Sequence, residues 1–376
     1  MSRLTIGILA ACAALGMGMT AGVMAQGAAA PVAKSVAVAA KKAEKKPVPA
    51  ATPAEDPVFK LFRRDLVNLL ALSGDARKQI AAAQIAAPDE ADASRSAQKK
   101  TPALLKRALE FGPKDPLVLW IAASNACMSQ PGCADPAALK TLQEVDPDNA
   151  AVWLLAFPVD GDAGKQRVSV ARMAQAQRYN DYWGGDVVAL YRALEVLPVP
   201  KEITALGLSP ESARINFATS IASAFLPTSL QSLHRFCVGL DAATEATAIS
   251  DCIAVARKLE GGGAFVAQGI GFAIEEALLA AGVDKDVMGV RRRSAAWQKQ
   301  KFMELSARFS REPELAQAYI DALDKAPDEP SAVIALLRGQ KLRTDPPEDW
   351  QPVVAPPPAP LPAGLPPIAP VPQGNP

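Results

Sequence analysis

Apolar residues recur at intervals of three and four through almost all of the chain between about residues 55 and 345. This spacing puts them on one side of an α-helix, where they form a buried stripe. No segment alternates apolar and polar residues over the length of a strand. The sequence therefore predicts an all-α protein. The clearest stripes are Phe59, Phe62, Leu66, Leu69 and Leu70; Val187, Leu190, Tyr191 and Leu194; Ile249, Cys252, Ile253, Ala256 and Leu259; and Leu315, Ala318, Tyr319 and Ala322.

Proline and glycine indicate where these helices begin and end. A side-chain oxygen can accept from first-turn amides, and proline is tolerated at the first helical position. Glycine favours the left-handed residue that often follows a helix. We expect helices of about 10 to 20 residues, packed as antiparallel pairs with short turns. The predicted starts are Asp56-Pro57, Thr101-Pro102, Asp115-Pro116, Asp135-Pro136 and Ser209-Pro210, and the predicted ends are at Gly74, Gly112, Gly239, Gly282 and Gly339.

The sequence around two of these turns is repeated. The run from Glu110 to Asp115 (EFGPKD) is followed by a similar run from Glu144 to Asn149 (EVDPDN). Between about residues 101 and 184 the chain resembles a tetratricopeptide repeat protein, whose period of 34 residues equals the interval from Pro113 to Pro147. In that register Leu119, Ala123, Ala126, Leu139 and Leu142 fall near the family's packing positions. The second unit departs from the pattern at Phe157-Pro158.

The resemblance implies a right-handed array of helical hairpins, an α-α superhelix, whose concave face binds a peptide or a protein. We expect residues 56–197 to form this tetratricopeptide-like region and residues 198–345 to form a second helical region.

The two ends of the chain differ in composition from this helical body. Residues 1–25 have Arg3, an apolar run and the small residues of a cleavage site, which predicts a signal peptide cut after Ala25. Two alternatives stay open: a transmembrane anchor, and a lipoprotein anchored through Cys12 of a lipobox-like run. Residues 26–55 are rich in Ala, Pro and Lys, and 13 prolines fall among residues 346–376. These compositions predict a disordered linker and a polyproline tail, which serves as a spacer or as a ligand for an aromatic groove.

Charge is almost balanced, with 40 Lys and Arg against 39 Asp and Glu. A polyanion binder needs a strong positive excess, so we expect no nucleic-acid partner. With the signal removed we also expect no stable membrane insertion. The predicted location is the periplasm or the exterior of a bacterium.

Apart from Cys12, the chain contains four cysteines, which allow three pairings in an oxidising compartment. The interpretation that we favour pairs neighbours, Cys127 with Cys133 and Cys237 with Cys252. The alternative joins His234, the only histidine, with Cys237 and Cys252 in a metal or thiol site. Only three ligands are visible there, so we predict no metal and no cofactor, and a His234 that lies at the surface or half-buried on a helix.

Residues 178–185 form the densest group of aromatic and hydrogen-bonding side chains in the chain. Such a group can stack on a sugar or hold a peptide. The alternative is a corner between helices, in which aromatic rings pack and Asn180 or Asp181 caps the next helix. The candidate binding residues are Tyr179, Asn180, Asp181, Tyr182 and Trp183.

Two further motifs suggest chemistry less clearly. The run Gly261-Gly262-Gly263 lacks the lysine and the spacing of a phosphate loop, so we expect it to end a helix, and we expect Gly269 and Gly271 to allow close helix packing. The adjacent acids Glu275 and Glu276 are the candidates for a catalytic carboxylate acting on cell-wall glycan. Because neighbouring helical residues point about 100° apart, one buried and one solvated Glu is the favoured interpretation.

Three consecutive arginines, Arg291, Arg292 and Arg293, lie in a helix expected from about Lys285 to Phe309. We expect them to pair with acids on neighbouring helices. The sequence as a whole predicts a noncatalytic scaffold that binds a protein or peptide of the cell envelope. The alternatives are a glycan-acting enzyme that uses Glu275 or Glu276, and a structural spacer.

Overall fold

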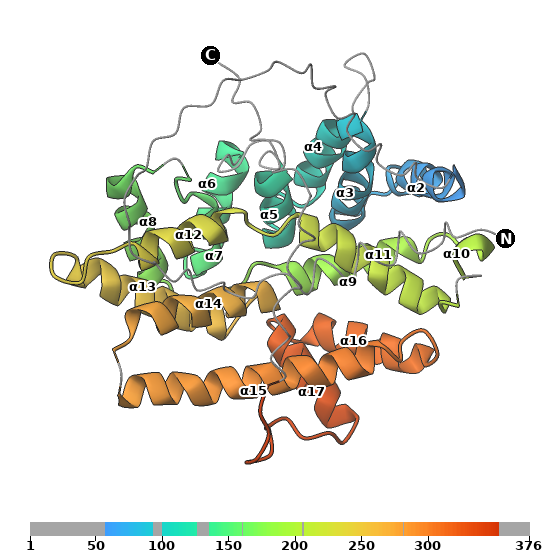
Figure 1. Cartoon of the computed structure of the whole chain (residues 1–376). Helices are drawn as coiled ribbons and strands as arrows, with labels where there is room; N and C mark the ends of the chain where they lie inside the picture. Colours follow the sequence, from blue (N-terminus) through green and yellow to red (C-terminus); the bar gives the residue numbers. More distant parts are fainter. Residues whose placement is uncertain are drawn as a thin grey trace, which may run out of the picture.

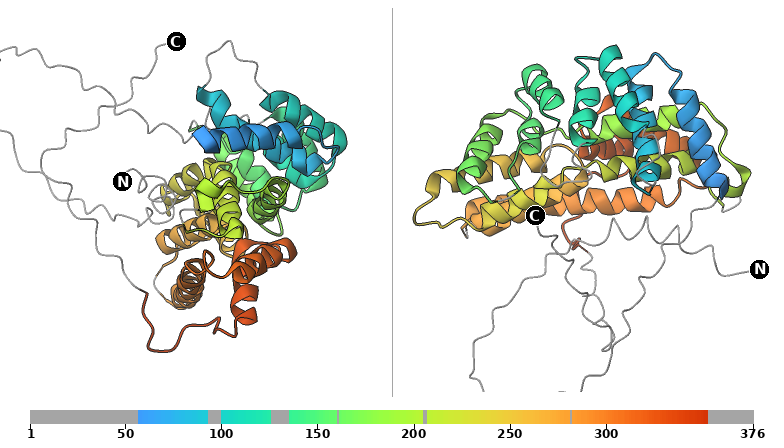
Figure 2. Two further views of the ribbon diagram at one scale, coloured as in Figure 1. Left: turned by 90° about the vertical axis from the view of Figure 1, so that its right-hand side faces the viewer. Right: turned by 90° about the horizontal axis from the view of Figure 1, so that it is seen from above.

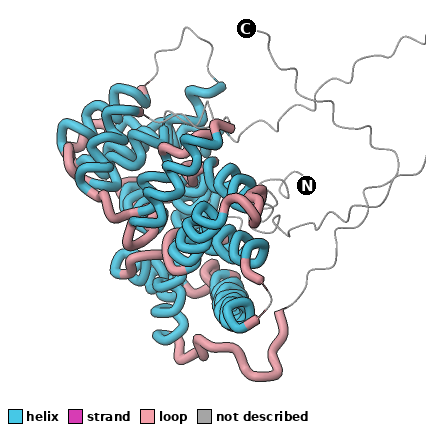
Figure 3. Tube along the Cα trace, turned by 90° about the vertical axis from the view of Figure 1, so that its left-hand side faces the viewer, coloured by secondary structure: helices cyan, strands magenta, loops and turns pink. Residues whose placement is uncertain are grey.

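The computed structural model describes residues 57–92, 100–125, 135–159, 161–204, 207–280 and 282–352. Every regular element in these ranges is an α-helix, and a single pair of bridging residues, Asn149 and Arg178, is the one β-type contact among them. The prediction of an all-α protein is confirmed, and Figure 3 shows helices joined by loops. The predicted signal peptide, linker, Cys12, Cys127 and Cys133, and most of the polyproline tail, lie outside the described residues.

The helices lie broadly in three tiers (Figures 1 and 2). The upper tier holds α2 (Pro57–Leu70), α3 (Ala76–Asp92), α4 (Thr101–Phe111), α5 (Pro116–Asn125), α6 (Pro136–Val145), α7 (Ala150–Leu155) and α8 (Ala163–Gln175). The middle tier holds α9 (Trp183–Leu194), α10 (Lys201–Thr204), α11 (Pro210–Ala224), α12 (Ser229–Val238), α13 (Ala246–Glu260) and α14 (Phe265–Leu278). The lower tier holds α15 (Val283–Ser306), α16 (Pro313–Lys325) and α17 (Glu329–Gly339).

Many consecutive helices pack as pairs, among them α3 with α4, α5 with α6, α7 with α8, and α13 with α14. Contacts between distant parts of the chain join the tiers as well: α3 touches α9, α8 touches α13, and α9 touches α16. A solenoid has contacts between neighbouring repeats alone. The described part of the chain therefore combines helical hairpins with long-range packing, which closes it into a layered body.

Local chemistry correctly predicts most of the helix starts. Asp135 accepts from the amides of two first-turn residues, and Ser209 accepts from the Ser212 amide. Asp115 Oδ1 accepts from the Leu117 amide at the start of α5. The predicted cap at Thr101 is wrong, because Thr101 lies inside α4, facing α3, and its Oγ1 donates to the Ala83 carbonyl at 3.3 Å.

Four of the five glycines predicted to end helices lie at or just beyond a helix end, and none of these four has the left-handed conformation. Gly112 and Gly239 follow α4 and α12, with φ of −134° and −83°. Gly74 lies beyond the end of α2, and Gly339 is the last residue of α17. Gly282 does have a positive φ, 136°, but it precedes α15.

Two apolar clusters form the core. The first joins α2, α3, α4, α9 and α11 to α15, α16 and α17, and the second joins α5 to α8 with α12, α13 and α14. Each cluster therefore draws on both regions that the sequence suggested, 56–197 and 198–345. Packing in the described residues does not separate at residue 197, where an extended stretch leads into α10.

The second cluster contains a disulfide. Cys237 at the end of α12 and Cys252 in α13 are bonded, with their Cα atoms 5.8 Å apart and both side chains fully buried. This confirms the neighbour pairing for these two residues and rules out their use as a metal-binding or thiol pair in this state. His234 is half-buried, as expected, and burial lowers its pKa.

None of the described helices is both long enough and apolar enough to cross a lipid bilayer.

Candidate functional site

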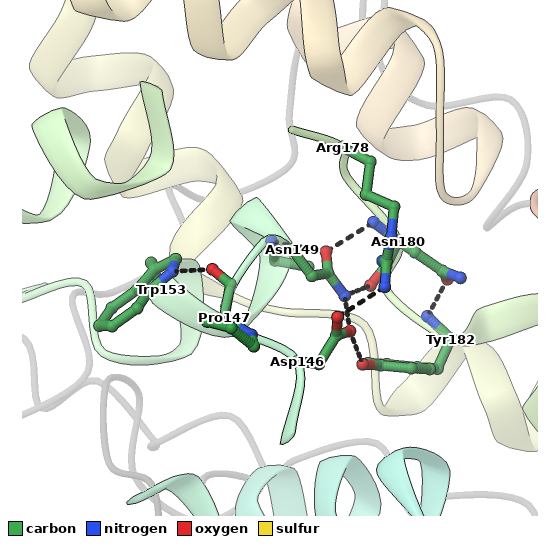
Figure 4. Close-up of polar contacts among 8 residues, drawn as sticks. Asp146, Pro147, Asn149, Trp153, Arg178, Asn180 and Tyr182 are labelled. Carbon is green, nitrogen blue, oxygen red and sulfur yellow. Dashed lines mark hydrogen bonds and ion pairs between the residues drawn. The ribbon is translucent and has the colours of Figure 1, made fainter. Parts of the chain in front are cut away.

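The segment between α8 and α9 contains four of the five candidate binding residues, and the fifth, Trp183, is the first residue of α9. Hydrogen bonds join this segment to the loop between α6 and α7 (Figure 4). Asn149 is fully buried there. Its Nδ2 donates to the Asn180 carbonyl and its Oδ1 accepts from the Asn180 amide, both at 2.8 Å. The amide of Ala150 donates to the Arg178 carbonyl at 2.8 Å. The Asn149 side chain thus bonds both backbone groups of Asn180, as a neighbouring strand would do in a β-sheet.

Asp146 reinforces this clamp. Its carboxylate accepts from Asn149 Nδ2 at 2.9 Å, from Arg178 Nη2 at 2.5 Å and from the Tyr182 hydroxyl. Burial and the hydrogen bond to Asp146 raise the pKa of Tyr182. Tyr182 also packs on Trp120 of α5, with ring centroids 5.3 Å apart. The hydroxyl of Tyr182 is therefore held by Asp146 and its ring by Trp120.

The other side of the segment is fastened to the turn between α13 and α14. Asp181 Oδ2 accepts from the Ala264 amide at 3.1 Å, and its Oδ1 accepts from the Trp183 amide at 3.2 Å. A Cβ on Gly262 would lie 2.1 Å from the Tyr179 carbonyl oxygen, and Gly263 has a φ of 71°. The glycine run therefore ends α13, as predicted, and it also allows the two backbones to approach.

These contacts match the interpretation of the segment as a corner. Tyr179, Asp181 and Trp183 are buried, whereas Asn180 and Tyr182 are half-buried. Asn180 Oδ1 accepts from the Tyr182 amide at 2.7 Å, so both polar residues hold the entry to α9. Binding of a partner through the five residues stays a prediction, and the exposed surface available for it belongs to Asn180 and Tyr182.

A second buried acid lies next to Asp181. Glu329, at the start of α17, accepts from the Phe265 amide through Oε2 at 2.8 Å. Burial raises the pKa of Glu329 to about 8 and that of Asp181 to about 6. The two carboxylates bind adjacent amides at the entry to α14, and they tie all three tiers together. Sequence reasoning missed this pair because the two acids are far apart along the chain.

The proposed catalytic acids divide as the favoured interpretation expects. Glu275 is fully buried, and its two oxygens bind Arg257 Nε at 2.7 Å and Arg291 Nη2 at 2.5 Å. Glu276 is exposed and pairs with Arg292. Glu275 is inaccessible to a glycan, and Glu276 has no second acid as its partner in these contacts. No observation at these two residues therefore favours the enzyme alternative.

Of the three consecutive arginines, Arg291 and Arg292 pair with acids on neighbouring helices, as expected. Arg291 also binds Glu260 of α13 at 2.9 Å, so it joins two acids from different helices. Arg293 differs from the prediction, because it donates to backbone carbonyls of the segment after α17, including that of Trp350 at 3.0 Å. In the described ranges, no group of three His, Cys, Asp or Glu side chains is placed to share a metal ion.

A small apolar hollow lies between α2, α11 and the segment that joins α9 to α11. Its volume is about 40 Å³, enough for roughly two or three water molecules or a small aliphatic side chain. Phe59 and Phe217 both line it and pack edge to face, with ring centroids 5.1 Å apart. The sequence predicted the apolar stripe of α2 but not the hollow, whose lining comes from several helices. The lining residues are Phe59, Phe62, Leu194, Val199, Ile203, Ala213, Arg214 and Phe217.

Comparison with known proteins gives no match: no family model, no curated protein and no solved structure is significantly similar to this chain.

Proposed function

We propose that this protein is an exported, noncatalytic scaffold of the bacterial cell envelope, which binds another protein or a peptide through its helical surface. The observation that carries the proposal is the apolar hollow beside α2 and α11. Small-molecule sites usually enclose about 300 to 1,000 Å³, whereas this hollow holds about 40 Å³. It suits one anchoring side chain of a macromolecular partner, as at the centre of many protein interfaces.

The lining supports a peptide partner in two ways. Its surface is mostly apolar, and aromatic rings provide rigid contact area. Arg214 is among the lining residues, and its guanidinium can donate to a carbonyl or carboxylate of the partner. A small aliphatic residue next to an acceptor group is the recognition element that we expect.

We assign the hairpins around α5 to α8 to a degenerate tetratricopeptide-like superhelix. Asp115 and Asn149 are 34 residues apart, and each accepts through Oδ1 from the amide two residues later, at the start of α5 and of α7. Equivalent caps at the family's period support this register. The hollow lies outside this stretch.

The binding proposal is tested by filling the hollow. Ala213→Leu adds a larger side chain at its lining, and Ser220→Leu adds the same side chain at an exposed position of the same helix. Peptides selected from a displayed library on the full-length protein are then titrated against each variant. We expect Ala213→Leu to weaken binding at least about tenfold, and Ser220→Leu to leave it unchanged. Equal affinities for both variants would contradict the proposal.

The envelope location is tested by fractionation of cells that produce the full-length chain. We expect the protein outside the cytoplasm, shortened at its N-terminus after Ala25. Retention of residues 1–25 in a cytoplasmic fraction would oppose export without bearing on the hollow.

A further inference from the structure

One helix face of the lower tier is apolar and exposed. Val283, Val287 and Val290 are 77%, 49% and 68% exposed. Their spacing of four and three residues puts them on one side of α15, over its N-terminal turns. We call these three residues the valine stripe. Arg291 and Arg292 attach the same part of α15 to α13 and α14 from other directions.

The same face is covered further along the helix. Trp297, seven residues after Val290, is buried, and its Nε1 donates to the Arg343 carbonyl at 3.0 Å. Trp350 stacks edge to face on Trp297, with ring centroids 5.4 Å apart. The cover is therefore the extended segment that follows α17. Figure 3, viewed toward the N-terminal end of α15, shows this loop passing beneath the helix.

The covering segment runs toward the N-terminus of α15. Gln298 donates to the Thr344 carbonyl at 3.1 Å, whereas Arg293, more than one turn earlier in the helix, donates to the Glu348 and Trp350 carbonyls at 2.6 and 3.0 Å. Between Thr344 and Glu348 the contacts thus move back along α15 by five residues, and the Trp350 ring still packs on Trp297. Arg293, which binds the Trp350 carbonyl, is three residues from Val290, and the described chain ends two residues after Trp350, at Pro352.

We propose that residues 353–358 of the chain continue along this face and cover the valine stripe. Their sequence is Val-Val-Ala-Pro-Pro-Pro, and no residue after 352 carries a charged side chain. The stripe runs from Val283 to Val290, seven steps along the helix, which is about 10 Å at 1.5 Å per residue. Six residues in polyproline conformation span about 19 Å. Length and polarity both suit the stripe, and the contact continues an interface that Trp350 begins.

Other occupants fit less well. A stable interface between proteins uses about 20 to 30 residues on each side, and the valine stripe is much smaller than that. The tail, in contrast, follows directly on a segment that is bonded to Arg293, three residues from Val290, so its apolar residues are held at a high effective concentration. The inference does not depend on the hollow beside α2 and α11 or on the partner proposed for it.

The test places a photoreactive benzophenone side chain at position 287 of the full-length protein. We expect cross-links within one chain, to peptides that contain residues 353–362, at a yield independent of protein concentration. The matched control is the same side chain at position 168 of α8, where Val168 is also exposed and lies in the upper tier. We expect no cross-link to the tail from position 168.

Two variants extend the test. Arg293→Ala removes the hydrogen bonds to the covering segment, and we expect it to reduce the cross-link severalfold. Arg292→Ala removes a pair with Glu276 instead, and we expect no change. Cross-links between two chains, or no cross-link from position 287 to the tail, would overturn the proposal.

A second readout applies even if Arg293→Ala fails to fold. A chain ending at Pro352 lacks the proposed cover, so hydrogen exchange of the amides of residues 284–292 becomes severalfold faster than in the full chain. The amides of α8 keep their rates. Equal rates at residues 284–292 in both chains would be evidence against the cover.

Discussion

At the scale of single residues, a few polar side chains decide how the helices are joined. Asn149 binds both the amide and the carbonyl of Asn180 and caps α7 through the Ala151 amide. Its side chain is fully buried, so a substitution that removes it also removes the partner of these backbone groups. The sequence indicated a turn here, because the run from Glu144 to Asn149 repeats the run that ends at Asp115. It did not show Asn180 as a partner, since that contact requires the segment after α8 to return to this loop.

We predict that Asn149→Ala lowers the free energy of unfolding by about 2 to 3 kcal/mol, because it removes four hydrogen bonds of a fully buried side chain. Urea denaturation followed by circular dichroism measures the change. Asn216→Ala is the control, since Asn216 is exposed on α11, and it should shift stability by less than about 0.5 kcal/mol. Similar effects of the two variants would refute the role of the clamp.

At the scale of elements, α13 and α14 approach so closely that one position of α14 accepts no side chain. A Cβ on Gly271 would lie 2.6 Å from the Ala256 carbonyl oxygen and 3.0 Å from the Glu260 nitrogen. At Gly269, one half-turn earlier, nothing lies within 4 Å. The sequence predicted close packing at both glycines. This prediction is wrong for Gly269, because the presence of a glycine does not tell which side of α14 faces α13.

The two glycines make a matched pair for mutation. We expect Gly271→Ala to destabilise the protein by about 1 to 3 kcal/mol, because the backbone of α13 has to move. We expect Gly269→Ala to stabilise it by about 0.5 to 1 kcal/mol, because alanine favours the helix and meets no neighbour. Thermal denaturation of both variants checks the opposite signs. Two shifts of the same sign would show that the approach of α13 does not decide the effect.

At the scale of the whole molecule, buried carboxyl groups lie where helices from different tiers meet. Burial raises the pKa of Glu329 to about 8, of Asp186 and Glu260 to about 7, and of Asp181 to about 6. The folded state therefore holds protons that the unfolded chain releases near its ordinary carboxyl values of 3.8 to 4.5. The free energy of unfolding consequently falls as the pH rises from the unfolded-state pKa values, near 4, to the raised folded-state values, of which the highest is about 8.

We predict that the midpoint of thermal denaturation is lower at pH 8 than at pH 5. Glu329→Gln keeps an oxygen that accepts from Phe265 but cannot ionise, so the fall should be smaller in this variant. The lowered pKa of His234 acts in the opposite direction near pH 6.5, through one half-buried group. Calorimetry at several pH values measures how the midpoint changes with pH in the original protein and in Glu329→Gln. A midpoint that rises from pH 5 to pH 8 would contradict the assignment of the buried acids.

The amino-acid sequence by itself determined the helical class, most of the helix starts, the bond between Cys237 and Cys252, and the different fates of Glu275 and Glu276. Each depends on periodicity, caps or neighbours within a few turns, which are properties of a short stretch of chain. Tertiary structure decided the rest: the Asn149 clamp, the pairing of Asp181 with Glu329, the burial of Trp183, and the hollow beside α11. These arise where segments distant along the chain meet, and a helical pattern specifies which face is buried but not which helix covers it.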